Sequence, residues 1–122
     1  MILGTGCDLA ECSRFANAAP SLLDKILTDQ EKAYCLQYAK SSERIAAKFA
    51  AKEAVLKALG TGWSQGIHWT DIEIVHDTLG KPQVILKGNA LAIAKSQGNF
   101  FFHISISHIE LFAMAFAIWE KI

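Results

Sequence analysis

Residues 41–59 form an alanine-rich segment that ends at Gly60, and no other segment constrains the fold as strongly. A glycine commonly follows the last turn of a helix, and Ser41 and Ser42 are candidates for the opposite cap. The sequence therefore predicts one long helix here. At about 100° per residue, its apolar side chains gather in a single stripe that contains Ile45, Phe49, Leu56 and Leu59.

Two charged residues interrupt this stripe, because Lys52 lies inside it and Glu53 borders it. Burial of a lone ammonium or carboxylate costs several kcal/mol, so each group needs a counter-charge or an ion. Alternatively, Lys52 extends its ammonium to solvent and Glu53 pairs with Lys57, four residues later.

A row of cations follows the same helix, with Lys40, Arg44, Lys48 and Lys52 repeating every four residues. Like charges at this spacing repel each other by a few tenths of a kcal/mol per pair, and a bound polyanion would offset the repulsion. A solvated basic face is the alternative interpretation.

The rest of the first half predicts one strand and two helices. Residues 1–8 are apolar with two glycines, and predict a short buried strand that ends in Asp8. Residues 11–19 are rich in alanine and predict a helix that stops before Pro20. Thr28 and Glu31 have the spacing of a capping box, so another helix should run from there to about Tyr38.

In the second half of the chain, the spacing of apolar residues changes from that of helices to that of strands. Strands are predicted over residues 71–76, 83–87, 101–107 and 111–119, and a helix over residues 89–97 that ends at Gly98. Helices thus fill the first half after one strand, and strands dominate the second. This order predicts an α+β fold in a single domain, residues 1–122, with a mostly antiparallel sheet of about five strands and helices on one face.

The composition excludes several classes of protein. Twelve Lys and Arg balance twelve Asp and Glu, whereas a general nucleic-acid binder carries a basic excess. Hydrophobic residues make up 52% and charged residues 20%, which excludes intrinsic disorder. No apolar run reaches the roughly 18 residues that span a bilayer, so no membrane association is expected. The three cysteines form no C-x-x-C pair and predict reduced thiols in a cytoplasmic protein.

Asp8 is a candidate cation ligand, although it could equally cap a following helix. If Asp8 and Glu53 converge, their oxygens suit Mg²⁺, which takes one or two carboxylates together with waters and phosphates. Zinc would require His or Cys as well. His103 and His108 are expected on opposite faces of one strand, so they should share no metal.

Several short motifs occur in the order seen in one enzyme family. Residues 6–14, GCDLAECSR, have the form G-x-D-x-x-E-x-x-R, and residues 49–57 read FAAKEAVLK, followed by ALGTG. Further blocks are DIEI at 71–74, GKP at 80–82 and SISH at 105–108. Over essentially its whole length, the chain resembles the holo-acyl-carrier-protein synthases, the small bacterial 4′-phosphopantetheinyl transferases.

The resemblance implies a Mg²⁺-dependent reaction. Coenzyme A donates its 4′-phosphopantetheine arm to a serine of apo acyl carrier protein and leaves adenosine 3′,5′-bisphosphate, in support of fatty acid biosynthesis. By motif position, Asp8 and Glu53 are the metal ligands, and Lys57 contacts phosphate near the reacting centre. A metal-held water, Glu53 or Lys57 could each remove the serine proton. The implied coenzyme A contacts are Arg44, Lys48, Lys52, Gly62, Lys81, Pro82, Ser107 and His108.

The resemblance also implies partners. The family usually carries several arginines in and after its first helix to dock the acidic carrier protein. Here Arg14 is present, but Leu22, Leu23 and Lys25 occupy nearby positions, so docking should use the side of the chain that carries Arg14 and Lys25.

A homotrimer with active sites between subunits is implied as well. Residues 111–119 are apolar on both faces of the expected strand, and Phe100–Phe102 cannot all face one side. A strand that is apolar on both faces must be buried on both, and the helices of one chain cover only one. The alternative is that this strand is central in a fully wrapped monomer.

Two other classes of function compete with the enzyme. A coenzyme A-binding module without activity would use the basic helix, but it has no need of both Asp8 and Glu53. A nucleic-acid-binding protein is supported only by the four-residue spacing of the cations.

Overall fold

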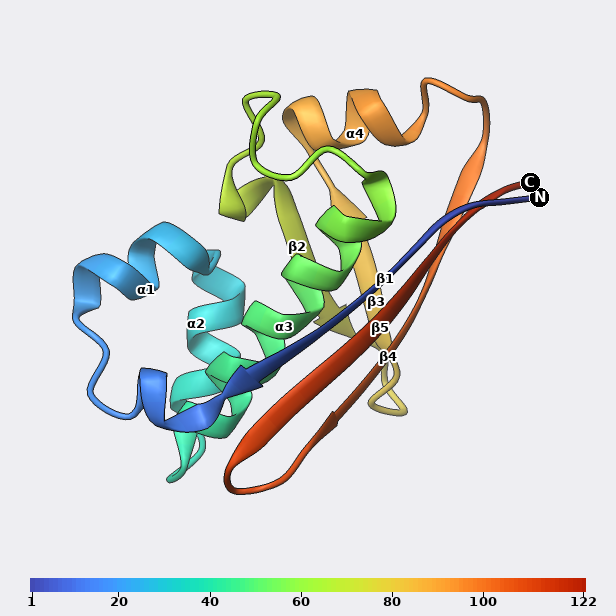
Figure 1. Cartoon of the computed structure of the whole chain (residues 1–122). Helices are drawn as coiled ribbons and strands as arrows, with labels where there is room; N and C mark the ends of the chain where they lie inside the picture. Colours follow the sequence, from blue (N-terminus) through green and yellow to red (C-terminus); the bar gives the residue numbers. More distant parts are fainter.

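The computed structural model describes residues 1–122 as an α+β fold, which confirms the predicted class, and the elements divide into two sheets and a group of helices (Figure 1). No helix combines the length and the apolar character needed to cross a membrane. The elements, in chain order, are β1 (Ile2–Glu11), a 3₁₀ turn (Cys12–Phe15), α1 (Pro20–Ile26), α2 (Asp29–Leu36), α3 (Ser41–Leu59), a second 3₁₀ turn (Trp69–Asp71), β2 (Ile72–His76), β3 (Pro82–Leu86), α4 (Gly88–Ala94), β4 (Phe100–His108) and β5 (Phe112–Lys121).

All strand pairs are antiparallel, as predicted, but the five strands form two sheets instead of one. The larger sheet has the order β1-β5-β4, and the smaller consists of β2 and β3. β3 packs beside β4, so the small sheet continues the large one without a hydrogen-bonded ladder between them.

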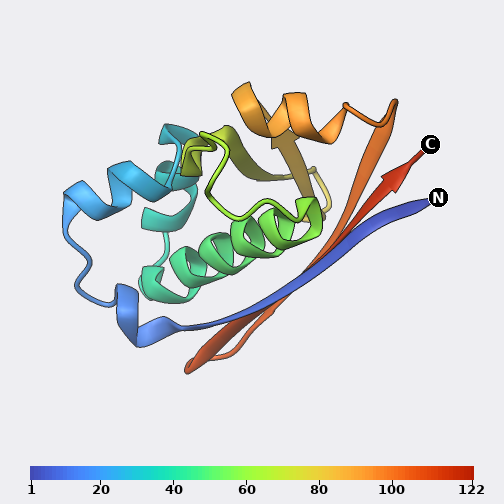
Figure 2. The same cartoon turned by 45° about the horizontal axis from the view of Figure 1, so that its top comes forward.

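Helix α3 lies across the inner face of the large sheet (Figure 2). Alanines of β5 line this face, and Ala113, Ala115 and Ala117 are fully buried beneath the helix. A Cβ atom on Gly4 would lie 1.9 Å from the carbonyl oxygen of Ala58, and one on Gly6 would lie 2.0 Å from that of Ala54. No side chain fits in either place, so β1 and α3 are in backbone contact.

The helix predicted over residues 11–19 is wrong. β1 continues to Glu11, which pairs with Phe112 of β5, and only one 3₁₀ turn follows. Strand pairing overrules local helix propensity at the start of this segment, at Glu11. The helix begins at Pro20 instead, where a proline suits the first turn. β1 is also not fully buried, because its residues alternate between a covered and an exposed face.

The strongest local signals are confirmed. Thr28 and Glu31 form the capping box at the start of α2, and Gly60 ends α3 in the left-handed conformation with φ 77°. The start of α3 differs from the prediction, because Lys40 occupies the cap position and no side chain caps the helix.

The outer face of the large sheet is apolar and uncovered by any element of the chain (Figure 2). Phe101 is 51% exposed, Met114 47% and Phe116 42%. This outer face is defined by Leu9, Phe101, Phe112, Met114 and Phe116.

Candidate active site

Asp8 and Lys57 meet beside the backbone contact of β1 and α3. Asp8 is the next inward-facing residue after Gly6 on β1, so its carboxylate lies against the helix. Lys57 Nζ is 3.2 Å from Asp8 Oδ1 and donates to the carbonyl oxygen of Cys7 at 3.0 Å. Lys57 thus pairs with Asp8 and not with Glu53, the partner that helix spacing alone suggests.

Glu53 is the second carboxylate of this site. Burial raises the pKa of Glu53, and the negative charge of nearby Asp8 raises it further. The indole N–H of Trp63 donates to Glu53 Oε1 at 3.4 Å and lowers this pKa. The positive charges of Lys57 and Arg14 lower it as well. Asp8 and Glu53 therefore lie near enough for their charges to interact, and we call them the carboxylate pair. Two neighbouring carboxylates are suited to a shared cation.

The chemistry of this pair fits magnesium and not zinc. The chain holds no group of three or more His, Cys, Asp or Glu side chains that could bind a metal. Two carboxylates alone leave most positions of a magnesium ion for water and substrate oxygens, which is how proteins usually bind it. A structural zinc site would need four protein ligands.

Lys52 is not available to a ligand. Its side chain is fully buried, and its Nζ lies 2.6 Å from Glu31 Oε1, 2.6 Å from the carbonyl oxygen of Ile72 and 3.0 Å from that of Trp69. These three acceptors use all three ammonium protons. The structure therefore contradicts the predicted phosphate contact of Lys52, and supplies the counter-charge that its position in the apolar stripe requires.

A cleft of about 430 Å³ lies on the other side of α3, between α2, β2 and β4. It brings together four of the predicted coenzyme A contacts, Arg44, Lys48, Pro82 and His108. Three aromatic side chains of the cleft were not predicted from the sequence: Tyr34, Tyr38 and His76.

Lys48 is buried at the back of this cleft. Its Nζ donates to the carbonyl oxygen of Ile74 at 2.6 Å, lies 3.0 Å from His76 Nε2 and sits 4.5 Å from the centre of the Tyr34 ring. Burial lowers the pKa of Lys48 to about 8, although nearby Glu31 opposes the change. Burial and the charge of Lys48 also lower the pKa of His76. A neutral His76 that is protonated on Nδ1 accepts from Lys48 and donates to Gly80.

Arg44 is held at the mouth of the cleft by aromatic and polar contacts. Its guanidinium carbon lies 4.1 Å from the centre of the Tyr38 ring, and one nitrogen lies 3.1 Å from His108 Nε2. The other ring nitrogen of His108 lies 3.0 Å from Glu43 Oε1. The cleft thus presents two oriented cations, Arg44 and Lys48, to a ligand, which favours an anion.

The carboxylate pair and the cleft lie on opposite sides of α3. Glu53 follows Lys48 by five residues, which is about 140° around a helix. In the sheet, Asp8 pairs with Ala115, which pairs with Ile106 at the wall of the cleft. Two strand spacings, about 9.5 Å, therefore separate the two positions, with α3 above them.

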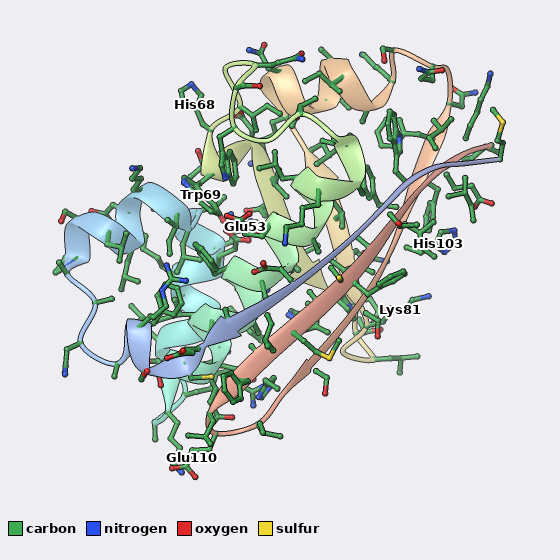
Figure 3. All side chains as sticks on the ribbon, in the orientation of Figure 1. Glu53, His68, Trp69, Lys81, His103 and Glu110 are labelled. Atoms are coloured by element: carbon green, nitrogen blue, oxygen red, sulfur yellow. The ribbon has the colours of Figure 1, made fainter.

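Three predicted contacts lie outside this cleft. Gly62 is exposed in the loop after α3, with φ 57°. Ser107 is exposed on the outer face of β4, opposite to His108. Lys81 lines a separate groove of about 450 Å³ between β3 and β4. Figure 3 places Lys81 and His103 on the other side of the long strands from Glu53 and Trp69. One chain does not bring these three residues to the cleft.

The missed residues had weak signals. Tyr34 and Tyr38 are four residues apart, the spacing of neighbours on a helix face. His76 ends a strand whose alternating pattern placed its side chain with Ile72 and Ile74 on the core side. Trp63, which contacts Glu53, gave no signal, because its position depends on the path of a loop.

The family model of the 4′-phosphopantetheinyl transferase superfamily matches residues 4–117. A holo-[acyl-carrier-protein] synthase of Geobacter sulfurreducens is 40% identical, over 99% of each chain. The crystal structure of a Neisseria meningitidis holo-[acyl-carrier-protein] synthase has a TM-score of 0.87 and 35% identity, over 99% of this chain and 100% of that one.

A second solved structure is a holo-(acyl-carrier-protein) synthase of Bacillus anthracis in complex with CoA (3′,5′-ADP). Its TM-score is 0.83 and its identity 33%, over 99% of this chain and 98% of that one. The likeness extends over almost the whole chain and is not confined to a motif. The chain belongs to the 4′-phosphopantetheinyl transferase superfamily.

Proposed function

We infer that the chain transfers the 4′-phosphopantetheine group of coenzyme A to a serine of apo acyl carrier protein, with release of adenosine 3′,5′-bisphosphate. This reaction produces the holo carrier protein that fatty acid biosynthesis requires. The observation that carries the inference is the end-to-end similarity to curated relatives named holo-[acyl-carrier-protein] synthase, 40% identical over 99% of the chain in the Geobacter sulfurreducens case.

Asp8 and Glu53 would hold a Mg²⁺ ion, since the pair supplies two hard oxygen ligands and lies next to Lys57. When bound, such an ion supplies charge stabilisation at the pyrophosphate that is cleaved. Lys57 is 53% exposed at its side chain and can turn from Asp8 to a phosphate oxygen of the substrate. Lys57 would then bring a positive charge next to the negative charge that develops at the phosphate.

The cleft would hold the nucleotide end of coenzyme A. Arg44 and Lys48 supply positive charge for phosphates, and His108 orients Arg44 through its ring nitrogen. Tyr34, stacked on His76 at 4.6 Å between ring centres, gives the cleft a flat aromatic wall. A purine and a phosphate group are the ligand chemistry that such a wall and such cations suit. Lys52 has no part in this contact.

The active site would be shared between subunits of a homotrimer. Within one chain, the carboxylates and the cleft are separated by α3, so one pyrophosphate cannot contact both. The exposed apolar outer face provides a surface for association. In a closed trimer, the cleft of one copy can meet Asp8 and Glu53 of the next. Gly62, Lys81 and Ser107, which lie outside the cleft, remain candidate contacts only in such an assembly.

Carrier protein would dock on the side that carries Arg14 and Lys25. Both residues are exposed, and the Arg14 guanidinium lies 5.0 Å from the centre of the Phe49 ring, next to Glu53 on α3. An acidic carrier would therefore approach the carboxylate pair along a basic edge. The reaction is placed in the cytoplasm, where Cys7, Cys12 and Cys35 would stay reduced.

One assay tests the inference directly. The chain is incubated with coenzyme A, Mg²⁺ and apo acyl carrier protein, and the carrier is then weighed by mass spectrometry. A mass gain equal to one phosphopantetheine group on the carrier serine is expected, and a carrier with that serine changed to alanine is the control. Binding of coenzyme A without any mass gain would reduce the chain to a coenzyme A-binding module.

A further inference from the structure

Glu53 receives its hydrogen bond from a residue that none of the motifs contains. The indole N–H of Trp63 donates to Glu53 Oε1 at 3.4 Å. Glu53 forms no ion pair, because Lys57 turns to Asp8. One oxygen of the carboxylate is therefore directed at the indole, which leaves Oε2 for another partner.

The Trp63 ring is itself held against a second indole. Its centre lies 3.9 Å from that of Trp69 in a tilted arrangement at 40°, and the Trp69 ring is stacked on Phe49 at 5.0 Å and 24°. Phe49 precedes Glu53 by one helical turn, so both lie on the same face of α3. The three rings run from Phe49 through Trp69 to Trp63, which contacts Glu53. Figure 3 shows Trp69 and Glu53 on the same side of the long strands.

The backbone beneath these rings is also held. The carbonyl oxygen of Trp69 accepts a hydrogen bond from Lys52 at 3.0 Å, and Lys52 is anchored by its buried pair with Glu31. Gly62, immediately before Trp63, has φ 57°, a conformation that reverses the chain after α3 and that side chains rarely adopt. The motifs suggest Gly62 and Lys52 for substrate contact. In this structure Gly62 sets the path of the chain into Trp63, and Lys52 holds the backbone of Trp69, against which the indole packs.

We propose that Trp63 is a positioning residue for Glu53: its indole, clamped on Trp69, fixes the carboxylate so that Oε2 faces a divalent cation. The proposal rests on the proposed function, in which Glu53 is a ligand of that cation. A carboxylate with a fixed orientation loses less freedom when it binds an ion, so removal of the indole donor weakens cation binding. Trp63 is a partly buried side chain packed against the hydrophobic core, so the test must keep an aromatic ring and remove only the N–H.

The experiment compares Trp63→Phe with Trp119→Phe in the full chain. Each change keeps an aromatic ring and removes an indole donor, since Trp119 donates to the carbonyl oxygen of Ala94 at 3.2 Å in the core, away from the site. Bound Mn²⁺ is measured from the loss of the free-ion signal in electron paramagnetic resonance, with coenzyme A present and a protein-free blank subtracted. Thermal unfolding of each variant verifies that it is folded.

Trp63→Phe should weaken Mn²⁺ binding about tenfold and raise by a similar factor the Mg²⁺ concentration that gives half the maximal rate. Turnover at saturating Mg²⁺ should change less, and Trp119→Phe should leave both measurements unchanged. Glu53→Gln distinguishes a failure of the positioning role from a failure of the proposed metal site. If Glu53→Gln abolishes Mn²⁺ binding and Trp63→Phe does not weaken it, the positioning role is overturned. If Glu53→Gln leaves Mn²⁺ binding intact, the proposed metal site is overturned and the positioning role with it.

Discussion

Lys52 Nζ and Glu31 Oε1 lie 2.6 Å apart, and neither side chain has contact with solvent. The other carboxylate oxygen of Glu31 accepts the backbone N–H of Ile74 at 2.8 Å. One buried pair thus joins α2, α3 and β2, the three elements whose side chains line much of the cleft. The first lysine of the K-E-x-x-x-K motif is thus buried beneath the cleft, with its ammonium bound to protein oxygens.

Removal of either partner of this pair should destabilise the fold. Lys52→Met leaves a buried carboxylate without its cation, and Glu31→Gln leaves a buried ammonium, so each should lower the free energy of unfolding by about 3–5 kcal/mol. Urea unfolding measures this change. Lys57→Met, which breaks the exposed pair with Asp8, is the control and should cost about 1 kcal/mol or less. A Lys52→Met protein of full stability with weakened coenzyme A binding would restore the phosphate-contact interpretation.

The carboxylates should be essential to transfer and dispensable to folding. Asp8→Asn and Glu53→Gln keep the volume of each side chain and remove a charged ligand. Each should lower the rate of carrier modification by about 100-fold or more, because a bound cation contributes several kcal/mol at the transition state. Circular dichroism and thermal unfolding should match the unchanged protein. A folded Glu53→Gln variant with near-normal turnover would contradict the assignment of Glu53.

Coenzyme A affinity should fall as the pH rises. Burial lowers the pKa of Lys48 to about 8, so the free protein loses this ammonium above that pH, while the phosphates of the ligand stay ionised. Calorimetric titration with adenosine 3′,5′-bisphosphate should give weaker binding at about pH 9.5 than at about pH 7, with uptake of protons at the higher pH. Lys48→Arg should remove the pH dependence, because arginine stays charged. An affinity of the unchanged protein that is flat over this range would exclude Lys48 as a phosphate contact.

Charge placed on the outer face should separate the subunits. Phe116→Glu introduces a carboxylate at a site that is 42% exposed in one chain, and should give a species of 13.4 kDa in sedimentation equilibrium, without transfer activity. Leu36→Glu, at a residue of α2 that is 57% exposed, is the matched control and should change neither mass nor activity. A 13.4 kDa form of the unchanged protein that is fully active would refute both the trimer and the shared site.

Two inactive variants should restore each other if the site is shared. Asp8→Asn lacks a carboxylate and Arg44→Ala lacks a cation of the cleft, yet each leaves the other half of the site intact. Co-refolding equal amounts should regenerate activity in roughly a quarter of the sites, since a random trimer pairs intact halves with that frequency. Mixing the folded proteins without exchange is the control. Activity that stays absent after verified exchange would place both halves within one chain.

Sequence reasoning succeeded where the signal is local. Gly60 ends α3 and Thr28 starts α2 because capping depends on neighbours within one turn. It failed over residues 11–19, where Glu11 belongs to a strand whose partner, Phe112, is far along the chain.

In the candidate site, too, contacts between distant parts of the chain could not be predicted from the sequence. The apolar stripe of α3 required a counter-charge for Lys52, but nothing near Lys52 in the sequence identified Glu31 as that counter-charge. Helix spacing suggested that Lys57 pairs with Glu53, whereas packing of β1 brings Asp8 to Lys57 instead. No relation between Lys48 and Glu53 was predicted from the sequence. Their placement on opposite sides of α3 supports the proposed shared site only once the cleft beside Lys48 is located.

Gly4 and Gly6 fix the relative position of the two carboxylates, because they let β1 pack directly against α3. Ala54 and Ala58 of α3 lie at backbone distance from these glycines, and the two elements bear Asp8 and Glu53. The conformational entropy of bringing these two carboxylates together is lost when the chain folds, not when an ion arrives. Preorganisation of this kind would let the two carboxylates hold the proposed cation with few protein ligands.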